Sequence, residues 1–213
     1  GFPIAEVDEA GSLVITKPNG SGGVVNTRTV KEQILYVLDD PTNYLTPDVI
    51  LDISEVEVEQ VGRDRVRVSG AKGKPAPDTW KVTISVDGGW LGEGGISYAG
   101  PNALARAKLA AQTIRERVDV LGLDCDLRTD LIGTVSIHDG DTGQLTQSFD
   151  GEPREVRMRA AANARDEATA ALVGREVESL YCNGPAGGGG VRRSTTWRVN
   201  TGSVLVPCKD MQP

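Results

Sequence analysis

A glycine-rich segment that ends in two adjacent arginines has the residue types best suited to binding chemistry. Glycines occupy positions 187–190, and the arginines follow after a single valine. Because glycine has no Cβ atom, consecutive glycines allow backbone N–H groups to converge on an anion. Guanidinium groups offer such a ligand positive charge and forked donors. The segment therefore predicts an anion site formed by Gly187, Gly188, Gly189, Gly190, Arg192 and Arg193.

The two arginines have different expected roles if the segment after the glycines is a strand. Successive side chains of a strand point to opposite faces. Only one of Arg192 and Arg193 would then reach the anion, and the other would pair with a carboxylate or meet solvent. The same residues also allow a plain flexible connection between a helix and a strand, with two solvated arginines.

A second glycine-rich loop contains Gly20, Gly22 and Gly23 and precedes a predicted helix over residues 29–39. Thr29 and Glu32 have the spacing of a capping box at the start of that helix. The free N–H groups and the dipole at a helix N-terminus favour an anion, so the three glycines are a second candidate anion site. A plain strand–loop–helix connection is the favoured alternative.

Several kinds of function are disfavoured by composition. The net charge of −7 argues against nucleic acid and against anionic membranes. No apolar run approaches the roughly 20 residues that span a bilayer. Three widely spaced cysteines argue against disulfides and zinc, so we expect a reducing, cytoplasmic location and no metal. The single histidine, His138, is interpreted as a surface or hydrogen-bonded residue. The catalytic residues remain unknown.

Hydrophobic periodicity predicts an α+β fold. Period 3.6 indicates helices over residues 29–39, 101–121 and 164–182. Alternating or short apolar runs indicate strands, at residues 12–16, 56–59, 65–68, 80–86, 130–137, 154–160, 191–199 and 203–206. The pattern in 80–86 directs Trp80, Val82, Ile84 and Val86 inward, and Gly88-Gly89 is interpreted as a turn.

The order of these elements predicts the architecture and the domain organisation. Two successive β-α-β units are expected within residues 79–213, in a mostly antiparallel sheet with helices on one face. Residues 1–78 are expected to form a separate region containing the second glycine loop, one helix and a β-hairpin.

Five blocks of sequence resemble the acyclic terpene utilisation (AtuA) family. They are Gly-Phe-Pro-Ile-Ala-Glu-Val at 1–7, Gly-Ser-Gly-Gly at 20–23, Tyr-Leu-Thr-Pro-Asp-Val at 44–49, Val-Arg-Val-Ser-Gly at 66–70, and the segment 183–193. The resemblance implies bacterial catabolism of branched acyclic acids as CoA thioesters, through a lyase- or hydratase-like step. It supplies no catalytic residues, and no cofactor beyond the CoA thioester substrate is implied.

Family members are larger and carry an N-terminal α/β part, so the resemblance implies that this chain is the C-terminal half of the conserved region. The expected partner is that N-terminal part or a separate subunit, and an oligomer is expected. Two functions follow as alternatives. One is part of an acyl-CoA enzyme, and the other is a non-catalytic module that completes a partner α/β domain.

Overall fold

The computed structural model of the chain describes residues 2–36, 38–137, 139 and 144–210. His138 lies outside these residues, so its interpretation stays a prediction.

The described chain divides into two compact units. The first unit consists of residues 1–82 and 203–213, and the second consists of residues 83–202. Two long strands, β8 (Thr79–Ala99) and β11 (Gly189–Pro207), contribute residues to both units. The first unit is therefore discontinuous in sequence, because the C-terminal part of β11 belongs to it.

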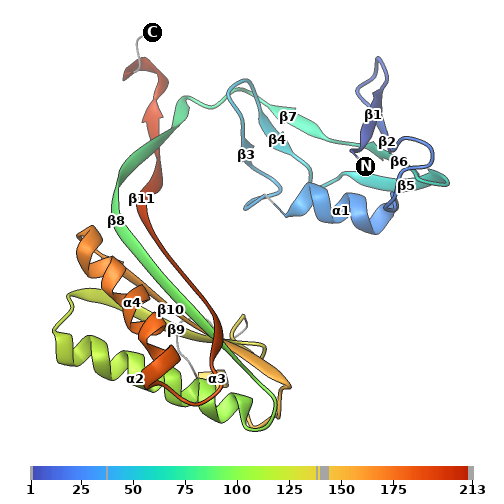
Figure 1. Cartoon of the computed structure of the whole chain (residues 1–213). Helices are drawn as coiled ribbons and strands as arrows, with labels where there is room; N and C mark the ends of the chain where they lie inside the picture. Colours follow the sequence, from blue (N-terminus) through green and yellow to red (C-terminus); the bar gives the residue numbers. More distant parts are fainter. Residues whose placement is uncertain (1, 37, 138, 140–143, 211–213) are drawn as a thin grey trace. The chain divides into compact units, whose positions relative to one another are not determined.

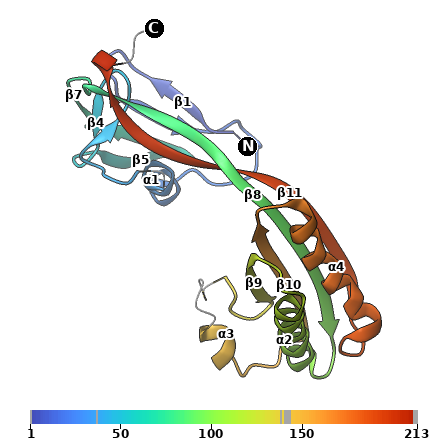
Figure 2. The same ribbon diagram turned by 90° about the vertical axis from the view of Figure 1, so that its left-hand side faces the viewer.

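The second unit is one antiparallel sheet with two helices on one face (Figure 1; Figure 2). Its elements in chain order are β8, α2 (Ala103–Leu121), β9 (Cys125–Ile132), α3 (Gln144–Ser148), β10 (Glu155–Ala164), α4 (Glu167–Asn183) and β11. The strand order β11-β8-β10-β9 is that of the split β-α-β, or ferredoxin-like, arrangement. The predicted α+β class with two β-α-β units is confirmed.

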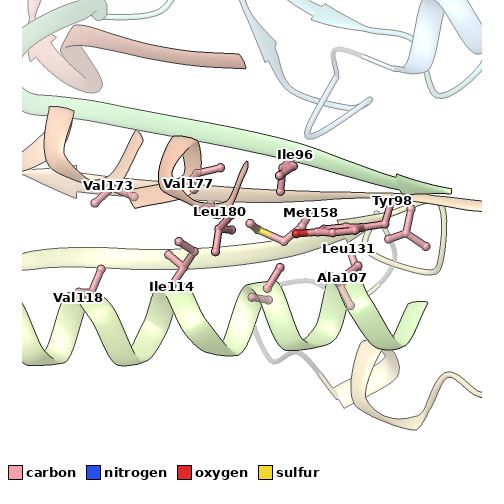
Figure 3. Close-up of a cluster of buried hydrophobic side chains, with 14 of the residues drawn as sticks. Ile96, Tyr98, Ala107, Ile114, Val118, Leu131, Met158, Val173, Val177 and Leu180 are labelled. Carbon is pink, nitrogen blue, oxygen red and sulfur yellow. The ribbon is translucent and has the colours of Figure 1, made fainter. Parts of the chain in front are cut away.

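The core of the second unit lies between this sheet and the helices α2 and α4 (Figure 3). Alternate residues of β8 and β10 face the helices, and Ile96, Tyr98 and Met158 are fully buried there. Val156, two residues before Met158 in β10, is buried on the same face. The helices contribute small and β-branched side chains, among them Ala107, Ile114, Val118, Val173 and Val177.

Glycines in β8 allow the strand to pack directly against α4. A Cβ atom built on Gly92 would lie 1.8 Å from the carbonyl oxygen of Ala170, and one on Gly94 would lie 2.7 Å from Val177 Cβ. Glycine within a strand often marks such a close approach of another backbone. The interpretation of Gly88-Gly89 as a turn was wrong, because β8 continues through both residues, with Gly89 at a φ of 74°.

The observed helix ends agree with the predicted ends at some positions and differ from them at others. Helix α2 ends at Leu121, as predicted, and Gly122 follows it in the left-handed conformation. Helix α4 is capped by Asp166, and hydrogen bonds from the backbone and then the hydroxyl of Thr169 hold the pKa of that carboxyl below its ordinary value. Helix α1 (Thr27–Leu35) is capped by Asn26, so the predicted Thr29–Glu32 capping box was wrong; Thr29 is instead the partner of Asn26.

Three predicted strand ranges were also wrong. The strand expected over 130–137 is β9, which runs from Cys125 to Ile132. The strands expected over 191–199 and 203–206 are one continuous strand, β11. Their alternation was recognised from the sequence, but their limits were not.

The first unit contains two small sheets and α1. Its larger sheet has the order β1-β2-β6-β5, and its smaller one has the order β3-β4-β7. The strands are β1 (Ile4–Val7), β2 (Leu13–Thr16), β3 (Tyr44–Leu45), β4 (Ile50–Asp52), β5 (Glu57–Gly62), β6 (Arg65–Ser69) and β7 (Lys72–Lys74). The predicted hairpin is β5–β6, and Glu59 and Arg67 form an ion pair across its strands at 3.2 Å.

Candidate functional site

The glycine-rich loop after α4 lies against the core of the second unit. A Cβ atom on Gly187 would lie 2.8 Å from Arg106 Nη1, and one on Gly188 would lie 2.7 Å from Ile96 Cδ1. A larger side chain at either position would collide with the core, so packing requires glycine there. Space is open around Gly189 and Gly190, and Gly190 has a φ of 64°, where glycine is favoured.

Arg106 of α2 fixes the start of this loop. Its Nη1 donates to the carbonyl oxygen of Ala186 at 2.8 Å, and its Nη2 donates to those of Ala99 and Pro101 at 2.6 and 2.9 Å. The guanidinium also lies over the ring of Tyr98, 5.7 Å from its centroid. One side chain thus joins the end of β8, the start of α2 and the glycine loop. This role of Arg106 was not predicted from the sequence.

Arg192 and Arg193 make different contacts, as the strand prediction required. Arg193 faces α4, where its Nε lies 3.0 Å from Glu178 Oε2. Arg192 directly precedes Arg193 in β11, so its side chain projects to the opposite face of the sheet. Its Nη1 donates to the carbonyl oxygen of Val191 at 2.9 Å. Of the two, Arg193 is the arginine paired with a carboxylate.

A hollow of about 280 Å³, which we call the arginine hollow, lies on the second unit. It is formed by Glu93, Gly94, Gly95, Arg157, Arg159, Arg192, Arg193 and Ser194. Arg157 of β10 donates through Nη1 to Ser97 Oγ at 3.1 Å and to the Gly190 carbonyl oxygen at 3.2 Å. A Cβ atom on Gly95 would lie 2.8 Å from Arg157 Nη2, so the guanidinium occupies the space that glycine leaves.

Arg159, next to Arg157 on the same face, is neutralised by two carboxylates. It donates through Nε to Glu93 Oε1 at 2.8 Å and through Nη1 to Asp130 Oδ2 at 2.9 Å. Burial opposes the charge of Arg159, but the hydrogen bonds that it donates to Glu93 and Asp130 outweigh this effect and raise the pKa of the guanidinium. Within the described residues, neither Arg157 nor Arg192 has a carboxylate partner.

The second glycine-rich loop lines a pocket of about 500 Å³ in the first unit. Most of its lining is apolar; it consists of Pro3, Leu13, Ile15, Lys17, Gly22, Gly23, Val24, Val25, Thr29, Val30, Gln33, Ile34 and Val68. We call it the apolar pocket. Gly22 and Gly23 belong to its lining, whereas Gly20 lies outside it.

Lys17 and the start of α1, both beside the apolar pocket, have polar partners within the protein. Lys17 Nζ donates to the Ser21 carbonyl oxygen at 2.8 Å and lies 3.5 Å from Asp64 Oδ2. The Asn26 side chain accepts from the first N–H groups of α1, at Arg28 and Thr29. Because these donors are already satisfied, the start of α1 offers an anion little. The pocket is better suited to a hydrocarbon ligand.

Among the described residues, no group of histidine, cysteine, aspartate or glutamate side chains is arranged to hold a metal ion. Cys125, Cys182 and Cys208 are free thiols. No helix in the described part of the chain has the length and apolar character needed to cross a membrane.

The comparison with protein families decides the relationship that the five sequence blocks indicated. The model of the family described as "Acyclic terpene utilisation family protein AtuA" matches residues 1–213. The chain belongs to the acyclic terpene utilisation family. Its membership places it in acyclic terpene utilisation. The match covers the whole chain and does not test whether this chain is the C-terminal half of the conserved region. That assignment therefore stays a prediction.

The comparisons with curated proteins and with solved structures found no similar protein. No curated protein and no solved structure matches the chain significantly. The geometry described above is therefore the basis for assigning a more specific function within the acyclic terpene utilisation family.

Proposed function

We propose that this chain binds the branched acyclic acyl group of a CoA thioester, as part of an enzyme with a lyase- or hydratase-like step. The supporting observation is the apolar pocket of the first unit. Its volume of about 500 Å³ lies within the roughly 300–1,000 Å³ typical of small-molecule sites. Branched apolar substrates are what a family active in acyclic terpene utilisation would have to hold.

The chemistry of the lining accounts for recognition of a hydrocarbon. Each methylene moved from water into such a pocket contributes about 0.8 kcal/mol, so a branched chain gains affinity with every carbon that enters. Lys17 is held by Asp64 and the Ser21 carbonyl oxygen, so it is not an exposed cation in the pocket. The charged CoA moiety would remain outside, and the lining supplies binding without an evident catalytic group.

Changing Val24→Asp should weaken binding of a methyl-branched acyl-CoA on the order of 10-fold or more. Val24 lines the pocket and is 63% exposed, so a carboxylate there would face the hydrocarbon without disturbing the core. The expected loss corresponds to the roughly 1.5–3 kcal/mol that burial of a valine-sized group contributes. Isothermal titration with the branched thioester, a straight-chain thioester and free CoA would measure it.

Val7→Asp is the matched control for this experiment. Val7 also belongs to the first unit and is 67% exposed, but it does not line the pocket. It should bind the thioester like the unmodified chain. Equal affinities for the branched thioester and free CoA, or equal losses in both variants, would contradict the assignment of the pocket.

We also propose a second function, that of a non-catalytic assembly module. Exposed apolar side chains of the second unit favour it. In β8, Ile84 and Val86 are 44% and 52% exposed, and in β11, Trp197 and Val199 are 54% and 47% exposed. The prediction that Ile84 and Val86 point inward was wrong. An alternating sequence does not show whether another layer of the protein covers that part of the strand. Trp197 Nε1 donates to Asp87 Oδ1 at 3.0 Å, which holds its ring beside β8.

If these side chains form an assembly surface, the chain should associate in a concentration-dependent way. The double change Ile84→Asp and Val86→Asp should shift sedimentation toward the monomer, because burying two carboxylates in an apolar contact is unfavourable. Leu109→Asp, at a 52% exposed position of α2, is the control. A chain that sediments as a monomer at every concentration would argue against the assembly function.

A further inference from the structure

We propose that the arginine hollow of the second unit binds an anionic group, a carboxylate or a phosphate, with Arg157 as its main contact and Arg192 as its second. This site is separate from the apolar pocket and rests on different observations. It retains Arg192 from the sequence prediction and adds Arg157, which the sequence did not indicate.

The guanidinium of Arg157 is already oriented for binding. Its Nη1 is held by Ser97 Oγ and by the Gly190 carbonyl oxygen, and the group lies over Gly95. No hydrogen bond of the described residues uses its Nε or Nη2. Those two nitrogens form one edge of the guanidinium fork, which can donate two parallel hydrogen bonds to a carboxylate or a phosphate. Little side-chain freedom remains to be lost on binding.

The charges around the hollow favour a negative ligand. Arg159 pairs with both Glu93 and Asp130, and Arg128 also pairs with Asp130, so two guanidinium groups compensate the two carboxylates. Arg157 and Arg192 line the same hollow, and neither has a carboxylate partner among the described residues. Two neighbouring cations repel each other, and a bound anion would relieve that repulsion. This local excess of positive charge stands out in a chain of net charge −7.

The size and lining of the hollow restrict the ligand class. Its volume of about 280 Å³ suits a carboxylate or phosphate group with a short attachment. The neighbouring uncharged residues are Gly94, Gly95 and Ser194, so the lining offers no large apolar surface to a hydrocarbon. Gly95 is a positioning residue, because any larger side chain would displace the Arg157 guanidinium.

The experiment measures the affinity of the whole chain for inorganic phosphate and, separately, for glutarate, at constant ionic strength. We expect saturable binding of at least one of these probes. Arg157→Gln should weaken it about 10- to 150-fold, the equivalent of the roughly 1.5–3 kcal/mol contributed by a charge-assisted contact. Arg192→Gln should have a smaller effect. Phosphate binding alone would assign a phosphate site, and glutarate binding alone would assign a carboxylate site.

Two further variants separate a specific site from general charge. Arg175→Gln removes the same charge from an exposed position of α4 and should leave both affinities unchanged. Gly95→Ala keeps the net charge but should lower the affinity, because its Cβ atom meets the guanidinium of Arg157. Thermal unfolding of each variant would verify that it is folded. No saturable binding of either probe, or an Arg157→Gln affinity equal to that of Arg175→Gln, would overturn the proposal.

Discussion

The substitution Gly92→Ala should destabilise the second unit by about 3 kcal/mol or more, at the upper end of what overpacking costs. The added Cβ atom would lie 1.8 Å from the Ala170 carbonyl oxygen. The obstacle is the backbone of α4, which cannot rotate away as a flexible side chain can. Strand and helix would have to separate, and the core between the sheet and α4 would lose its packing. Urea unfolding followed by circular dichroism would measure the loss.

Gly189→Ala is the matched control for this change. No heavy atom of the residues that the structure describes lies within 4 Å of a Cβ atom built on Gly189. Its free energy of unfolding should stay within about 1 kcal/mol of that of the unmodified chain, the usual range of a glycine-to-alanine change at an unstrained position. Equal stabilities of the two variants would show that β8 and α4 do not pack as closely as described.

The sequence was sufficient to predict elements whose signals are local. Helix α2 has apolar residues at helical spacing and a glycine at Gly122, and the structure has the helix end there. The hairpin β5–β6 has alternating charged and apolar residues, which indicated its two strands. Such elements depend on neighbours within a few residues, so a single sequence contains most of the information needed.

The glycines of β8 show where local reasoning failed. Gly88-Gly89 has the composition of a turn, but β8 continues through it. Gly92 and Gly94 are required because α4 lies against the strand, and the contacting residues are Ala170 and Val177. A glycine that avoids another backbone cannot be distinguished in sequence from one that begins a turn, because the partner is distant in the chain.

The candidate anion site was predicted only in part for the same reason. The adjacent arginines were recognised, and their projection to opposite faces followed from strand geometry. Arg157 was not recognised, because its position depends on the register of β10 with β8, in which Arg157 pairs with Ser97. The register of two distant strands cannot be inferred from this sequence alone, so the role of Arg157 in the arginine hollow was recognised only in the structure.

The substitution Arg106→Met should destabilise the second unit by about 3 kcal/mol and loosen the glycine-rich loop. Arg106 donates to the carbonyl oxygens of Ala99, Pro101 and Ala186, and methionine can donate to none of them. Hydrogen bonds to a charged group contribute about 1.5–3 kcal/mol each, and partial exposure reduces the sum. Hydrogen exchange should quicken in residues 184–190, and urea unfolding should report the loss of stability.

The same change should also weaken anion binding, although Arg106 does not line the arginine hollow. Ala186 anchors the loop whose Gly190 carbonyl oxygen orients Arg157, so a looser loop holds that guanidinium less firmly. Arg106→Lys is the control: its single ammonium can reach fewer of the three carbonyl oxygens, so its stability and exchange rates should be intermediate. Unchanged exchange in the loop of Arg106→Met would show that packing of Gly187 and Gly188 on the core suffices to hold it.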